Sequence, residues 1–230
     1  AAVVRIKEPH TEGKWTKKGI AMTADCNSRY VYLNPRRGGA IAVAEAARNI
    51  VCSGGKPLAV TDCLNYASPE DPEIMWQFRE SLKGISEACI AFGTPIISGN
   101  VSLYNETKGQ PVDPSAVIAC LGKLADYHKA ITMEFKQADS TIMLIGERKD
   151  ELGGSVFYQL YNELGANVPQ PDFKEVENQI YAITDLIDNG LLLSCHDISD
   201  GGLSVALAEM CFGGDGKNRI GCDIQLDNVE

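Results

Sequence analysis

The stretch that decides the fold is residues 58–100, LAVTDCLNYASPEDPEIMWQFRESLKGISEACIAFGTPIISGN. It opens with an apolar run, residues 58–62, which predicts a short strand that ends on a carboxylate. Asp71, which a proline follows, is typical of a helix N-cap, and apolar residues then recur at spacings of four and three until Gly93. A second apolar run, residues 95–98, ends before a Gly-Asn pair. This order of strand, helix and strand predicts a mixed α/β domain.

The same alternation continues on both sides of this stretch. We expect a helix over residues 40–53 and a strand over residues 117–121, after which the pattern restarts. We therefore place an A lobe at 1–126 and a B lobe at 127–230, which we expect to be incomplete at its C-terminus because the chain ends soon after a last strand-like run. The elements expected in the B lobe are strands at 141–145 and 191–194 and helices at 155–164, 172–189 and 203–211. The predicted fold class is α/β (α+β), with two lobes that each contain a sheet and helices.

The composition excludes several classes of protein. Of the 230 residues 44% are hydrophobic and 23% are charged, and no apolar run reaches the roughly 20 residues that a membrane span needs. The formal net charge of −10 disfavours binding to nucleic acid or to an anionic membrane, because both attract clustered Lys and Arg. Eight scattered cysteines, none in a C-x-x-C pair, indicate small buried side chains in a reducing, cytoplasmic compartment rather than disulfides or a zinc site.

Three oxygen donors in the first 50 residues have a spacing that suits a metal ion. Glu45 and Asn49 lie four residues apart and share one face of the predicted helix, and Asp25 ends the strand that precedes it. Hard cations such as Mg²⁺ prefer carboxylate and phosphate oxygens. The alternative is that Glu45 pairs with Arg48 or solvent and that Asn49 helps to end the helix. Spacing alone leaves both interpretations open.

Polar residues also follow the predicted strands of the opening stretch. Asp62 ends one strand, and Gly99 and Asn100 end the next, with Ser102 two residues further on. In α/β folds ligands gather outside the carboxyl ends of the strands, where glycine lets a phosphate approach the backbone. The alternative is that Asp62 and Asn100 only cap turns.

Two further segments leave alternatives open. In residues 196–202, HDISDGG, His196 is either a general base or a structural residue, and Asp197 and Asp200 either bind a metal or cap the following helix. The Gly-rich residues 152–155 either present backbone N–H groups to an anion or form a plain tight turn. They match neither a P-loop nor a dinucleotide-binding fingerprint.

Five short runs, which occur in a fixed order, are distinctive enough to compare the sequence with known families. They are residues 23–30 (TADCNSRY), 42–49 (AVAEAARN), 61–65 (TDCLN), 98–106 (SGNVSLYNE) and 196–203 (HDISDGGL). With these runs the chain resembles the phosphoribosylformylglycinamidine synthase family of purine biosynthesis, and within it the second half of the synthetase subunit (subunit II). The resemblance covers nearly the whole chain, and the run at 98–106 is its most distinctive part.

The resemblance implies a fold and a reaction. Family members look like aminoimidazole ribonucleotide synthetase, in which the sheet of one A lobe pairs with another A lobe to close a barrel and the B lobe combines a sheet with helices. The implied reaction is that of an ATP-dependent C–N ligase, which converts formylglycinamide ribonucleotide and ammonia to formylglycinamidine ribonucleotide. The implied partners are the first half of the same synthetase, a glutaminase subunit that supplies ammonia and a small bridging subunit, with a homodimer through the A lobe as a further possibility.

Site residues carry over from the family one position at a time. By resemblance Asp62 and Gly99 contact ATP, Asn100 helps to hold Mg²⁺, and Ser102 touches the ribonucleotide substrate. The catalytic histidine of the family belongs to the first half, so we expect no catalytic residue in this chain and no turnover by the chain alone.

A second site follows from the same resemblance. Asp25, Glu45, Asn49 and Asp197 resemble a pseudo-symmetric site that holds ADP and magnesium ions structurally in large relatives. Two other functions remain open on the sequence: a stand-alone homodimeric ATP-dependent kinase or synthetase of the same superfamily, and a non-catalytic half that binds nucleotide.

Overall fold

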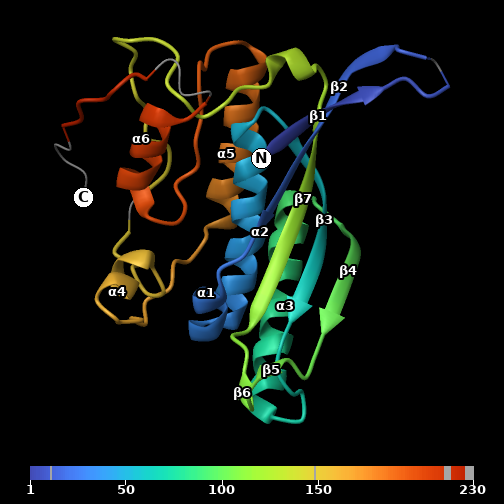
Figure 1. Ribbon diagram of the computed structural model, residues 1–230, viewed down its shortest axis with the longest axis vertical. Helices are drawn as coiled ribbons and strands as arrows, with labels where there is room; N and C mark the ends of the chain where they lie inside the picture. Colours follow the sequence, from blue (N-terminus) through green and yellow to red (C-terminus); the bar gives the residue numbers. More distant parts are fainter. Residues whose placement is uncertain (11, 148, 215–218, 226–230) are drawn as a thin grey trace.

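The computed structural model describes residues 1–10, 12–147, 149–214 and 219–225. Within these ranges, the first 124 residues contain a five-stranded sheet, a two-stranded sheet and three helices, and the rest contain a 3₁₀ turn and three helices (Figure 1). The elements in chain order are β1 (Ala2–Lys7), β2 (Trp15–Asp25), α1 (Ser28–Leu33), α2 (Pro35–Cys52), β3 (Lys56–Asn65), α3 (Pro72–Phe92), β4 (Ile96–Ser102), β5 (Glu106–Thr107), β6 (Gln110–Pro111), β7 (Ser115–Leu124), η1 (Tyr127–Lys129), α4 (Val156–Leu160), α5 (Phe173–Asp188) and α6 (Gly202–Phe212).

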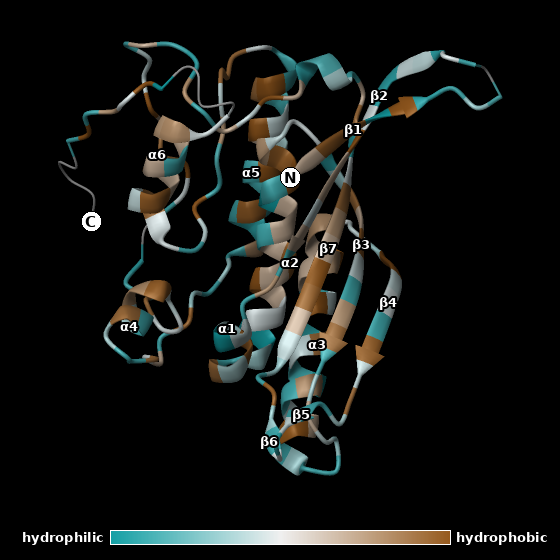
Figure 2. Ribbon diagram, in the orientation of Figure 1, coloured by the Kyte–Doolittle hydropathy of each residue, from teal (hydrophilic) through white to brown (hydrophobic). Residues whose placement is uncertain are grey.

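The main sheet has the strand order β1-β2-β7-β3-β4. Strands β3 and β4 are parallel and joined through α3, as the opening stretch predicts, while the other neighbours are antiparallel. Strand β1, which was not predicted, forms a hairpin with β2. Hydrophobic residues run along the central strand β7 in Figure 2. In the described part of the chain β4 is an edge strand, and its residues are exposed up to Ser102, which is half-buried.

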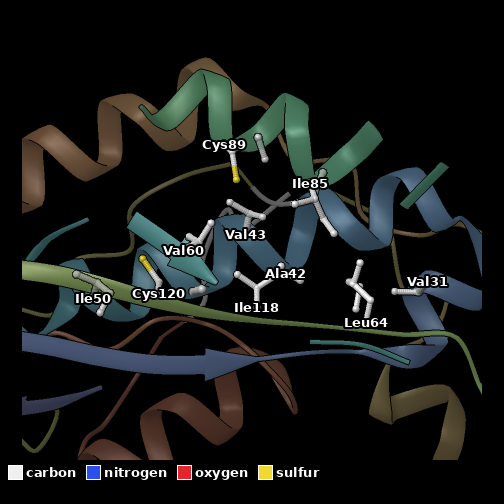
Figure 3. Packing of buried hydrophobic residues seen from close by; sticks show 14 of the residues in the cluster. Val31, Ala42, Val43, Ile50, Val60, Leu64, Ile85, Cys89, Ile118 and Cys120 are labelled. Atoms are coloured by element: carbon white, nitrogen blue, oxygen red, sulfur yellow. The ribbon is translucent and has the colours of Figure 1, made fainter. Parts of the chain in front are cut away.

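Helices α2 and α3 cover one face of this sheet, and the hydrophobic core lies between these helices and the sheet (Figures 1 and 3). Val43 of α2 and Ile85 of α3 are fully buried against Ile118 of β7. Ile118 alternates along β7 with residues whose side chains lie on the other face of the sheet. The helices α2 and α3 and the strand β7 all contribute side chains to this core. Their packing therefore determines where the ends of the strands lie relative to α2.

Helix α2 starts five residues earlier than the predicted residue 40. Asn34 caps it by accepting a hydrogen bond from the Arg37 backbone N–H, 3.0 Å away. The prediction was wrong because the Gly38-Gly39 pair disfavours an isolated helix. In the folded chain a Cβ on Gly39 would lie 2.4 Å from the carbonyl oxygen of Ser81. Glycine is therefore what allows α2 and α3 to cross with their backbones in contact.

The second half of the chain differs most from the prediction. Between residues 127 and 225 the described positions contain no strand, so the strands expected at 141–145 and 191–194 are wrong. Apolar side chains of these runs are exposed, among them Met143 and Leu191 at 66% and 68%. An apolar run becomes a strand only where a neighbouring strand completes its hydrogen-bond ladder, and these runs are part of no sheet in the described chain. Helix α4 is also shorter than the predicted helix at 155–164.

Helix α5 connects the second half to the first. Asp172 caps it by accepting from the backbone N–H of Lys174 and Glu175, and Val176 and Ile180 pack on α2. No helix in the described ranges has the length and apolar character that crossing a membrane requires.

Candidate nucleotide and metal sites

The structure brings the donors of the predicted metal site to one place. Asp25 ends β2, and Asn49 of α2 donates a hydrogen bond from Nδ2 to Asp25 Oδ1, 3.2 Å away. One turn earlier on α2, Glu45 Oε1 accepts a hydrogen bond from the Ser199 hydroxyl. Ser199 lies in the loop after α5 that also carries Asp197. The site, which we call the acidic cluster (Asp25, Glu45, Asn49 and Asp197), is therefore assembled by a strand, a helix and a distant loop.

Burial makes the acidic cluster electrostatically costly. Burial raises the pKa of both Asp25 and Glu45, and the negative charge of Asp197 raises the pKa of each further. The Asp197 side chain is only 5% exposed. Its Oδ1 lies 3.2 Å from Nδ1 of His196, but its buried Oδ2 has no hydrogen-bond partner among the described residues. A buried carboxylate oxygen without a partner is unfavourable unless a cation or a proton is present.

The side chains of the acidic cluster are of the types that bind a hard cation. Carboxylate and amide oxygens are the donors that Mg²⁺ prefers, and a divalent charge would offset the repulsion between Asp25, Glu45 and Asp197. In the conformation described, however, no three His, Cys, Asp or Glu side chains of the described residues converge closely enough to hold an ion. A bound cation would have to draw the donors together.

The structure decides between several alternatives in this region. Helix α6 begins after Gly201 without any side-chain cap, so neither Asp197 nor Asp200 caps it. Asp200 instead accepts a hydrogen bond from Asn27, at 3.5 Å. Glu209 orients the His196 ring, because Nε2 of His196 lies 2.7 Å from Glu209 Oε2. No motif in the sequence indicates this contact, because Glu209 lies 13 residues further along the chain.

The second group of predicted residues lies where β3 and β4 run side by side. The prediction that Asp62, Gly99 and Asn100 end their strands was wrong, because pairing between the two strands continues to Asn65 and Ser102. Asp62 is paired with Gly99, and its carboxylate accepts a hydrogen bond from the backbone N–H of Asn100. A Cβ on Gly99 would lie 2.4 Å from Asp62 Oδ1. Glycine at position 99 thus leaves the space that the carboxylate occupies, which explains why the two residues occur together.

Asn100 and Ser102 are arranged differently from Asp62. Side chains alternate along a strand, and Asn100 accordingly contacts Cys63, with its Nδ2 3.9 Å from the sulfur. Ser102 donates a hydrogen bond to Asn105 Oδ1, 3.1 Å away. Asn105, which the prediction did not single out, lines a cavity of about 430 Å³. We call Asp62, Gly99, Asn100 and Ser102 the strand-end site.

Three backbone N–H groups of the Gly-rich turn at 152–155 are already engaged within the chain. The backbone N–H groups of Gly153, Gly154 and Ser155 donate to carbonyl oxygens of Asn167, Leu164 and Leu152 at 2.7–3.1 Å. Of the two interpretations, the structure supports the plain tight turn.

Two family descriptions match the chain. The N-terminal domain of AIR synthase related protein matches residues 1–124, and the C-terminal domain of AIR synthase related protein matches residues 137–230. The chain therefore belongs to the AIR synthase related family.

Solved structures of similar fold belong to two kinds of enzyme. Phosphoribosylformylglycinamidine synthase II from Thermotoga maritima is 24% identical with a TM-score of 0.57, and the match covers 90% of this chain and 30% of that one. PurL from T. maritima complexed with ATP is 22% identical with a TM-score of 0.58 and the same coverage. Thiamine monophosphate kinase from Aquifex aeolicus is 14% identical with a TM-score of 0.52, covering 84% of this chain and 63% of the kinase. These similarities show the mixed α/β fold, and the chain spans less than a third of the length of the Thermotoga proteins.

Proposed function

We propose that the chain is the ATP-contacting second half of a phosphoribosylformylglycinamidine synthase. Its reaction would be the ATP-dependent conversion of formylglycinamide ribonucleotide and ammonia to formylglycinamidine ribonucleotide, with ADP and phosphate as the other products. The observation that carries the proposal is the pairing of Asp62 with Gly99 on two parallel strands, because glycine there leaves room for a carboxylate beside the exposed strand β4. Ligands of α/β enzymes bind toward the carboxyl ends of parallel strands, and both residues lie three positions before those ends.

Each residue of the strand-end site has a role in this proposal. Asp62 and the backbone at Gly99 position ATP, and Asn100 contributes an oxygen ligand for Mg²⁺. The metal, when bound, would neutralise phosphate charge. Ser102 contacts the ribonucleotide, and the cavity beside its partner Asn105 offers the space for it. ATP activates the substrate amide oxygen, and ammonia then displaces the phosphate at the same carbon.

The acidic cluster has a structural role in the same proposal. Asp25, Glu45, Asn49 and Asp197 would hold an adenine nucleotide through Mg²⁺. The buried, unpartnered Oδ2 of Asp197 and the raised pKa values of Asp25 and Glu45 support a cation at this position. With a net charge of −10 the protein would bind a nucleotide poorly without the metal.

The partners are part of the proposal as well. They are the first half of the synthetase, which supplies the catalytic histidine, a glutaminase subunit and a small bridging subunit. The uncovered face of the main sheet supports an A-lobe contact, since Val4 and Met22 are 51% and 42% exposed there.

A stand-alone homodimeric kinase or synthetase is the second candidate. The observation in its favour is the fold of thiamine monophosphate kinase, of which this chain covers 63%. A non-catalytic, nucleotide-binding half is the third candidate, and the acidic cluster supports it.

The test combines the purified chain with a separately produced first half of the synthetase. With ATP, Mg²⁺, ammonia and formylglycinamide ribonucleotide, we expect ADP release only from the mixture. Asp62→Ala should lower this rate at least a hundredfold, whereas the exposed Asp113→Ala should not change it. Substrate phosphorylation by the chain alone would favour the kinase instead.

A further inference from the structure

Two cysteines that lie 143 positions apart in the chain meet beside the acidic cluster. Cys52 is the last residue of α2, and Cys195 directly precedes His196 and Asp197 in the loop after α5. Their sulfur atoms are 3.4 Å apart. Both thiols are free, and both residues are half-buried.

This contact differs from the other close pair of cysteines in the molecule. Cys211 and Cys222 are 3.5 Å apart at sulfur, but only 11 positions separate them, and Cys222 is exposed. A bond between Cys211 and Cys222 would close a short loop at the end of the chain. A bond between Cys52 and Cys195 would join helix α2 of the A lobe to the second half.

We propose that Cys52 and Cys195 are a reversible redox pair whose disulfide locks the loop that carries Asp197 against helix α2. The sulfur atoms need to approach by only about 1.4 Å to reach the length of a disulfide bond. The proposal does not depend on the proposed function, because its chemistry needs only the two thiols and an oxidant.

The oxidant that fits is a small peroxide. One thiolate attacks a peroxide oxygen, the O–O bond breaks, and a sulfenic acid and water form. The second thiol then attacks the sulfenic sulfur, so that the S–S bond forms, the S–O bond breaks and a second water leaves. Two thiols and one hydrogen peroxide thus yield one disulfide and two water molecules, and a dithiol reductant reverses the change.

The position of the bond gives it consequences for the site. Glu45 and Asn49 lie on α2 before Cys52, and Asp197 and Ser199 follow Cys195 on the loop. The disulfide would hold both ends of the contact between Glu45 and Ser199 in place. It would also close a very long loop of the unfolded chain, and such crosslinks stabilise a fold most.

The experiment uses the full chain with Cys211→Ser, which removes the other close pair. After full reduction, one equivalent of hydrogen peroxide should lower the free thiols by two, and a non-reducing digest should contain one crosslink, between Cys52 and Cys195. The oxidised protein should melt about 5–15 °C higher than the reduced protein. Dithiothreitol should reverse both changes.

The matched controls are Cys52→Ser and Cys195→Ser in the same background. Cys195→Ser changes a loop residue and keeps the test valid if replacing Cys52 disturbs α2. Neither control should gain stability with peroxide. The proposal is overturned if all thiols of the Cys211→Ser protein persist, if Cys52 and Cys195 crosslink to other cysteines, or if Cys195→Ser shows the same rise in Tm.

Discussion

The acidic cluster and the strand-end site both consist of oxygen donors near strand ends, but their surroundings differ. The acidic cluster is enclosed by β2, α2 and the loop after α5, and it contains a carboxylate that is 5% exposed. The strand-end site lies on the edge strand β4, whose residues are exposed up to Gly99 and Asn100. The donors of the acidic cluster are therefore surrounded by segments of this chain, whereas the strand-end site is open on one side.

The difference suggests that the two sites have different functions. An enclosed set of repelling carboxylates is suited to holding one ion permanently, because the enclosure makes the empty site unfavourable. An open strand end is suited to substrates that enter and leave, and it needs a second surface to exclude water during catalysis. The predictions below test this contrast.

The largest effect we expect is the complete absence of turnover by the chain alone. In the proposed function a partner supplies the catalytic histidine, so the open strand-end site alone should not form formylglycinamidine ribonucleotide from ATP, Mg²⁺, ammonia and substrate. The measurement is product formation over hours by chromatography. Steady turnover would mean that the strand-end site is complete without a partner.

The second prediction concerns the uncovered face of the sheet. Val4 and Met22 are large, exposed and apolar, so the chain should self-associate at tens of micromolar, on the order of ordinary weak interfaces. Met22→Glu should weaken this association about tenfold or more, because it would bury a charge. Sedimentation velocity measures the effect, with the exposed α3 variant Met75→Glu as control. A parent protein that stays monomeric would contradict the prediction.

The third prediction assigns nucleotide-dependent stability to the acidic cluster. A hundredfold excess of ADP over its Kd, with Mg²⁺, should stabilise the fold by about 2.7 kcal/mol, or raise Tm by about 5–11 °C. Glu45→Ala with Asn49→Ala should remove most of this shift, and so should omission of magnesium. Asp62→Ala at the open site is the matched control and should keep the shift. An equal shift in the double variant would show that the enclosed donors do not hold the metal.

The fourth prediction concerns the space at Gly99. In Gly99→Ala the new Cβ would meet Asp62 Oδ1 at 2.4 Å, so the carboxylate must move, at a cost of about 1–3 kcal/mol in the free energy of unfolding. Urea denaturation measures the cost. The neighbouring exposed Ser98→Ala should change stability by less than about 0.5 kcal/mol. A neutral Gly99→Ala would mean that Asp62 moves freely and is not held for a ligand.

The smallest effect is a dependence of stability on pH without metal. The pKa values of Asp25 and Glu45 are raised in the folded protein, so the fold binds protons more tightly than the unfolded chain does. The free energy of unfolding should therefore increase as the pH falls through the raised values, and the gain should be complete below the ordinary values of 3.8 and 4.5.

Urea midpoints between pH 7 and 5 measure this dependence. Asp25→Asn with Glu45→Gln should flatten it, and so should Mg²⁺ for the parent. Carboxylates with lowered pKa values, such as Asp172, act in the opposite direction but only at lower pH. A slope that survives in the double variant would place its origin elsewhere.

The sequence correctly predicted structural features that depend on residues close together in the chain. Asp71 and Gly93 fixed the two ends of α3, because a cap and a left-handed glycine act within one turn of the chain. The strands expected at 141–145 and 191–194 were wrong because a strand depends on partners elsewhere in the chain. The start of α2 was missed because Gly38 and Gly39 have their reason in α3.

The candidate sites show the same limit. The four-residue spacing of Glu45 and Asn49 placed them on one helix face, as the structure has them. The hydrogen bond between Asn49 and Asp25 and the orientation of His196 by Glu209 depend on tertiary packing. The residue types and their spacing predicted which side chains could act as donors. The distances between these side chains depend on the tertiary fold.

The edge strand β4 also has a consequence for how the protein behaves in the test tube. In the described part of the chain it has a neighbour on one side only, and Ile96, Ile97 and Val101 along it are 41%, 64% and 50% exposed. A strand with an unpaired side and apolar residues is a template for strands from other molecules, and no proline or lysine interrupts it between 96 and 102. Concentrated or refolding samples of the isolated chain should therefore pass readily into cross-β aggregates, and solubility should improve when a lysine replaces Ile97.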